Sequence, residues 1–117
     1  MSKSNEILNG IAARVQAHAS VKNGGEFAID PMTILAIINV MIGIARFIYQ
    51  CRKDKDAISQ QMRKPSLFHR LIIRRGINRE WKDKNQRKVM YDAFLEVGAS
   101  LSEKEISTLV TEVENLE

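Results

Sequence analysis

The chain has 117 residues, 44% hydrophobic and 27% charged, with a formal net charge of +4 at pH 7. That length suits one domain, and the composition is typical of a globular protein with a modest core. With Cys51 as its one cysteine, the chain cannot form an intrachain disulfide, and we expect a core or interface thiol. The first residues lead into an amphipathic segment instead of a signal peptide, so we expect a protein that is not secreted.

Residues 4–22 are predicted to form an amphipathic helix, because apolar residues recur at helical spacing from Ile7 to Val15. The glycines at 24 and 25 should end this helix, since glycine readily takes the left-handed conformation found at helix C-termini. A short link follows, from which Phe27 and Ile29 are expected to pack on the core.

A second helix is predicted over about residues 31–51, which form the longest apolar run of the chain. Asp30 is a good N-cap and Pro31 suits the first helical position. A polar or small stripe lies along this helix, which is either exposed to solvent or a seam for close approach of another helix. The stripe consists of Ala36, Asn39, Gly43, Arg46 and Gln50.

The sequence leaves two alternatives for the end of this central segment, 30–64. Either one bent helix continues across the charged residues at 52–56, or a break near Asp54 divides the segment into two helices. Pro65 ends the segment in both cases, because the residue before a proline resists the α conformation.

Three further helices are predicted in residues 65–117. A short helix runs from Ser66 to Arg75 and ends at Gly76; the next begins between residues 78 and 85, buries Trp81, and stops at Gly98. The last begins with a capping box, Ser102 to Glu105, flanked by the apolar pair of a hydrophobic staple. The chain is therefore predicted to be one all-α domain of four to six helices around the central apolar helix, with 1–29 as its N-terminal helix and link.

No catalytic, cofactor-binding or metal-binding motif stands out in the sequence. His18 and His69 have no Cys, Asp or Glu at ligand spacing, and no phosphate-binding loop or nucleophile elbow is present. We therefore expect no catalytic site, no cofactor and no metal, and we expect both histidines on the surface or on helix flanks.

Charge is strongly segregated along the chain. Residues 52–88 carry thirteen lysines and arginines against four acids, whereas residues 89–117 carry one lysine against seven acids. The basic segment is expected to contact nucleic acid or an acidic partner, or to pair with the acidic C-terminal helix. Its aromatic residues would either stack on bases or belong to the core. The predicted contact residues are Arg70, Arg74, Arg75, Arg79, Lys82, Arg87 and Lys88.

Three features occur in an order typical of one group of proteins: Asp30-Pro31 opening an Ile-rich helix that closes on Cys51, then Pro-Ser-Leu-Phe-His-Arg-Leu-Ile-Ile-Arg-Arg at 65–75, then Tyr-Asp-Ala-Phe-Leu-Glu-Val-Gly-Ala-Ser-Leu-Ser at 91–102. Over residues 30–117 the chain resembles small, mostly uncharacterised virion and accessory proteins of large tailed bacteriophages. The resemblance implies a structural or accessory role in a virion or in the host cytoplasm, and it transfers no functional residues.

The first functional hypothesis is a non-enzymatic structural or interaction protein that binds other protein subunits, including copies of itself. It would dock through complementary charge and through exposed apolar residues of the central helix, namely Ile37, Met41, Ile44 and Ile48. The second is a nucleic-acid-binding accessory protein. The third, a single-span membrane protein, is disfavoured because only fifteen residues, 31–45, are free of charge and a span needs about twenty.

Overall fold

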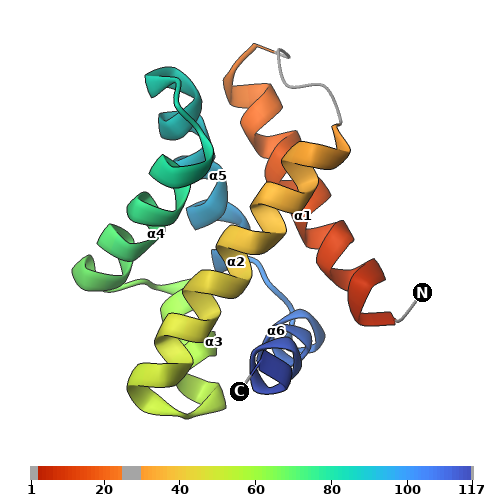
Figure 1. Cartoon of the computed structure of the whole chain (residues 1–117), viewed down its shortest axis with the longest axis vertical. Helices are drawn as coiled ribbons and strands as arrows, with labels where there is room; N and C mark the ends of the chain where they lie inside the picture. The colour runs from red at the N-terminus through yellow and green to blue at the C-terminus, as the bar shows by residue number, and fades with distance from the viewer. Residues whose placement is uncertain (1–2, 25–29, 117) are drawn as a thin grey trace.

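The computed structural model describes residues 3–24 and 30–116, and within these ranges the chain forms six helices and no strands. This confirms the predicted all-α fold. Helix α2 crosses the front of the molecule between α1 and α4, with α5 behind (Figure 1). The predicted positions of Phe27 and Ile29 lie outside the described residues. The helices are α1 (Lys3–Lys22), α2 (Pro31–Arg52), α3 (Lys55–Arg63), α4 (Leu67–Glu80), α5 (Lys84–Ala99) and α6 (Glu103–Leu116).

The central segment forms two helices. At its start, the Asp30 carboxylate accepts a hydrogen bond from the Met32 amide at 2.9 Å, which confirms the predicted N-cap. Helix α2 ends where Lys53 takes a left-handed conformation, with φ of 50°. Asp54 then caps α3 by accepting from the Asp56 amide at 3.0 Å. Two successive caps therefore fix the break that the sequence left open.

The apolar face of α2 is enclosed by α1, α3, α4 and α6. Ile37, Met41, Ile44 and Ile48 are each at most 4% exposed, so the prediction that these four residues are exposed for docking is wrong. The sequence could not reveal this, because nearly every side of α2 is apolar and only the packed structure shows which side the core uses.

The polar stripe of α2 is largely open to solvent. Asn39, Gly43, Arg46 and Gln50 are exposed, and Ala36 is half-buried. A Cβ added at Gly43 would meet no atom within 4 Å, so no described helix of the chain closes on this part of the stripe. Cys51 is exposed too, so of the two expected positions for its thiol the core is wrong, and an interface stays a prediction.

By length and composition α2 could cross a membrane, with a mean hydropathy of 1.9 over its most apolar window. The core helix of a water-soluble domain meets the same requirements. A third of that window is buried against the rest of the chain.

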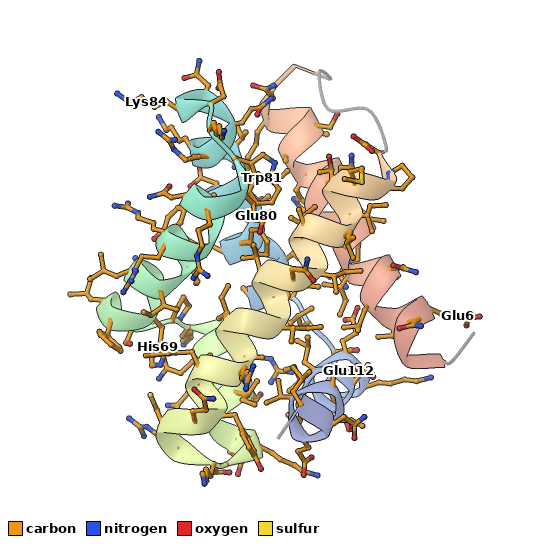
Figure 2. All side chains as sticks on the ribbon, in the orientation of Figure 1. Glu6, His69, Glu80, Trp81, Lys84 and Glu112 are labelled. Carbon is orange, nitrogen blue, oxygen red and sulfur yellow. The ribbon has the colours of Figure 1, made fainter. Side chains whose placement is uncertain are left out.

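The boundaries of α4 and α5 differ from the predicted ones. Helix α4 continues through Gly76, where an added Cβ would lie 3.2 Å from Val40 of α2, so this glycine permits a close helix contact and does not end the helix. Trp81 is buried in the link after α4 and is not part of α5 (Figure 2).

Helix α5 passes through Gly98 to Ala99. A Cβ at Gly98 would come within 2.6 Å of the Met62 carbonyl oxygen of α3, so the two backbones touch at this point. Glycine is therefore required here by proximity and not by a turn.

The capping box of α6 is confirmed. The Ser102 amide donates to the Glu105 carboxylate at 2.8 Å, and the Glu105 amide donates to the Ser102 hydroxyl at 3.2 Å. Leu101 and Ile106 are both buried, as a hydrophobic staple requires.

Candidate interaction surface

Helix α4 presents an apolar crest to solvent. Its inward face buries His69, Ile73 and Ile77, while Leu67 and Leu71, one turn apart, are 81% and 57% exposed. Large apolar side chains exposed on neighbouring helical turns are characteristic of an interaction site. Helical spacing places two pairs of arginines beside this crest, one pair on each flank.

The flank of α4 that faces α5 carries Arg70 and Arg74. The Arg74 guanidinium lies over the Tyr91 ring of α5, 4.7 Å from its centre, a cation–π contact that holds the charge against the surface. Arg87 and Lys88 are one turn before Tyr91 on α5 and therefore lie on the side of α5 that faces α4. The Arg87 guanidinium donates to the Lys82 carbonyl at 2.8 Å, which ties α5 to the preceding link.

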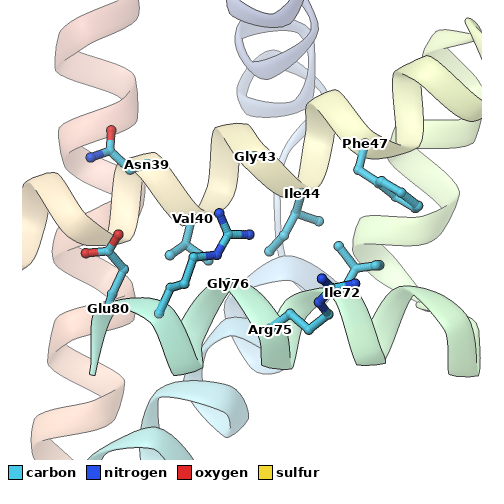
Figure 3. A pocket seen from close by; sticks show the side chains of 10 residues that line it. Asn39, Val40, Gly43, Ile44, Phe47, Ile72, Arg75, Gly76 and Glu80 are labelled. Carbon is cyan, nitrogen blue, oxygen red and sulfur yellow. The ribbon is translucent and has the colours of Figure 1, made fainter. Parts of the chain in front are cut away.

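The other flank of α4 borders a groove of about 360 Å³ between α2 and α4 (Figure 3). Val40 and Ile44 point from α2 toward α4 and form part of an apolar floor. The groove is open at Gly43, where an added Cβ would meet no atom within 4 Å. Polar groups at its margin come from both helices: Asn39 from α2, and Arg75, Arg79 and Glu80 from α4.

The seven predicted contact residues have no anionic partner among the described residues. Four ion pairs join described side chains, and none includes these seven residues. Six of the seven are exposed, and Arg87 is half-buried. Their positive charge is therefore available to a partner. Those ion pairs are Arg14–Glu105, His18–Glu96, Lys22–Glu96 and Arg63–Glu103.

The acids of α5 and α6 mainly pair with α1. Arg14 donates a hydrogen bond to the Glu105 carboxylate at 2.7 Å. Burial alone would raise the pKa of Glu105. The hydrogen bonds from the Ser102 amide and from Arg14 outweigh burial, so the pKa is lowered. The hydrogen bond from Lys22 lowers the pKa of Glu96. Pairing between the basic segment and the acidic helix, which the sequence left open, occurs among the described residues at Arg63.

The aromatic residues within and next to the basic segment are mostly unavailable for stacking. Trp81 is buried, and Tyr91 is half-buried beneath Arg74. Phe68 is the exception: it is 56% exposed, and its ring packs 5.5 Å from that of Phe47. A partner could therefore reach Phe68, whereas the other two rings serve the fold.

A serine–histidine pair lies at the start of α4. The Ser66 hydroxyl is 2.6 Å from Nδ1 of His69 and also caps the helix by accepting from the His69 amide. Burial lowers the pKa of His69, and the charge of Arg52 lowers it further. Among the described residues, no carboxylate is hydrogen-bonded to the ring, as the third member of a catalytic triad would be. Ser66 is the N-cap of α4, and a serine directly before an apolar helical segment could have signalled this role.

Sequence reasoning missed the groove, because its two walls come from segments about thirty residues apart. Among the described residues, no cluster of three or more His, Cys, Asp or Glu is placed to hold a metal ion. Comparison of the chain with protein-family models, curated proteins and solved structures finds no match.

Proposed function

We propose that the protein is a non-enzymatic interaction protein, a structural or accessory component of a virion, that docks on an acidic protein partner through α4. One observation carries the proposal: the exposed crest of Leu67 and Leu71 is flanked by arginines that have no acidic partner in the described chain. The virion assignment depends on the resemblance of residues 30–117 to small phage proteins.

The composition of this face suits a protein partner. Interfaces combine apolar anchors near the centre with polar groups at the rim, and arginine is enriched among the residues that dominate binding energy. Complementary charge around the anchors accelerates association and fixes the orientation of the partner. An acidic partner with an apolar patch would satisfy both the crest and its flanks.

Nucleic acid is the second candidate, favoured by the arginines on both flanks of α4 and by the accessible ring of Phe68. The exposed leucines argue for protein instead, because phosphates offer them no apolar surface. Phe68 alone is a small stacking platform, because Trp81 is buried and Tyr91 is half-buried beneath Arg74.

Two double variants test the proposal. Arg70→Glu with Arg74→Glu reverses the charge of one flank, whereas Leu67→Ser with Leu71→Ser removes the crest. Exposed lysines of α3 and α6 supply the matched charge control, Lys55→Glu with Lys104→Glu. Each protein is immobilised, and capture of a protein from nuclease-treated lysate of the native host or infected cell is quantified.

Capture that survives in the control and is lost in both test variants supports docking of a protein on α4. Binding to a DNA duplex that falls at least about tenfold between 50 and 200 mM salt, and that ignores the crest substitutions, would establish the nucleic-acid candidate instead. A wild-type chain that captures no protein refutes the proposal.

A further inference from the structure

The groove between α2 and α4 depends on a glycine that the fold itself does not need. Gly43 lies in the interior of α2, where glycine weakens a helix relative to alanine. An added Cβ would meet nothing within 4 Å, so neither packing nor backbone conformation requires glycine there. Glycine leaves an open space in the wall of the groove. Val40 and Ile44 line the groove beside this space, and arginines line it on the α4 side.

A complementary feature lies on α6 of the same chain. Leu116 is 51% exposed in the last turn of this acidic helix, and Glu112 precedes it by one turn on the same side. Glu112 takes part in none of the ion pairs between described residues. Arg75 and Arg79 line the groove, so an apolar side chain with an adjacent carboxylate matches the groove in chemistry.

We propose that the α2–α4 groove binds the last turn of α6 from a second copy of this chain, with Leu116 over Gly43 and Glu112 facing the groove arginines. The inference rests on the proposed function, because it names this chain as an acidic partner of one flank of α4. The opposite flank, with Arg70 and Arg74, is left for an external partner.

The geometry makes this contact head-to-tail. Helix α6 packs on α1, α2 and α3, and the labelled Glu112 lies on the other side of α2 from α4 (Figure 2). The groove and the last turn of α6 are therefore separate surfaces of one copy. Copies join in an open chain, unless the rotation between successive copies closes a ring. A single helical turn buries far less than the roughly 1,200 Å² of a stable interface, so association should be weak.

The test uses two variants, each of which disables one side of the contact. Gly43→Leu fills the groove and leaves the last turn of α6 unchanged. Leu116→Ser removes the apolar side chain from that turn and leaves the groove unchanged. Gly10→Leu is the control, because Gly10 is also an exposed helical glycine with nothing within 4 Å of an added Cβ. Sedimentation velocity over a concentration series up to the millimolar range reports the mass, and circular dichroism checks that each variant is folded.

Wild-type protein and the Gly10→Leu control should increase in mass with concentration, while Gly43→Leu and Leu116→Ser each remain monomeric. An equimolar mixture of these two variants should form dimers and nothing larger. The intact groove of Leu116→Ser can bind the intact last turn of α6 of Gly43→Leu, and neither variant has a second functional site to extend the chain. Added salt should weaken the association, since the contact includes exposed charges.

Three results would overturn the inference: wild-type protein that is monomeric at millimolar concentration, single variants that associate like wild type, or a mixture that stays monomeric. If Gly43→Leu reduces capture of an external protein while the wild type does not self-associate, the groove belongs to that external partner. The Arg70→Glu, Arg74→Glu variant separates the two proposals, because it should lose the external partner and retain self-association.

Discussion

Replacing Gly98 by alanine should destabilise the protein, although alanine is the better helix former. The new Cβ would lie 2.6 Å from the Met62 carbonyl oxygen, about 0.8 Å closer than the 3.4 Å at which ordinary contacts begin. The new Cβ is held rigidly by the α5 backbone and the oxygen belongs to the α3 backbone, so α3 and α5 must move apart. Overpacking of this kind costs up to about 3 kcal/mol, and the helix-propensity gain of about 1 kcal/mol offsets part of it. The net loss is therefore about 2 kcal/mol.

Thermal and urea unfolding, followed by circular dichroism, measure this loss. For a domain of this size, 2 kcal/mol corresponds to a fall in Tm of about 8 °C. Gly10→Ala and Gly43→Ala are the controls: neither Cβ meets an atom within 4 Å, so each should raise stability by about 0.5–1 kcal/mol. If Gly98→Ala is as stable as the wild type while both controls are stabilised, α3 and α5 do not make this close contact.

Other substitutions test the electrostatics and the core. The pKa of Glu105 is lower in the folded protein than its unfolded value of about 4.5, so the carboxylate stabilises the fold above that pH. This contribution is lost as the pH falls through the folded pKa. Glu105→Gln should therefore reduce the loss of unfolding free energy, measured in urea, on going to acidic pH. The lowered pKa of His69 also makes the protein less stable on acidification, because below the unfolded value of about 6.5 the unfolded chain binds more protons than the folded one. His69→Gln should remove this dependence of the unfolding free energy on pH. An unchanged pH dependence would contradict the burial of the ring. Ile37→Ala should cost about 2–5 kcal/mol, whereas Leu35→Ala, at a half-exposed site of α2, should change stability by less than about 0.5 kcal/mol; equal effects would refute the assignment of the buried face.

Helix starts were predictable from sequence because their chemistry is local. Asp30 and Ser102 each cap a helix through atoms within three residues, so the residue types alone indicate the bond. The same reasoning failed at Gly76 and Gly98, because a glycine that permits contact with a distant helix looks identical in sequence to one that ends its own helix.

The candidate surface was predictable in part. Charge counting identified the basic segment, and the structure shows that its seven predicted contact residues lack acidic partners in the described chain. Charge counting could not show that the four predicted arginines of α4 divide between its two flanks, nor that Trp81 is buried. Those facts depend on how α4 lies against α2 and α5, which is set by long-range packing.

The exposed part of α2 narrows where a partner can bind this helix. Its Ile-rich face is occupied by the protein's own core, so the high hydropathy of the segment reflects folding and not a free docking surface. Two regions remain: the exposed apolar pair Met32 and Leu35 near its start, and the stripe that includes Asn39 and Gly43. The stripe borders a groove whose arginines have no ion-pair partner among the described residues, so a partner that recognises α2 by both shape and charge should bind there.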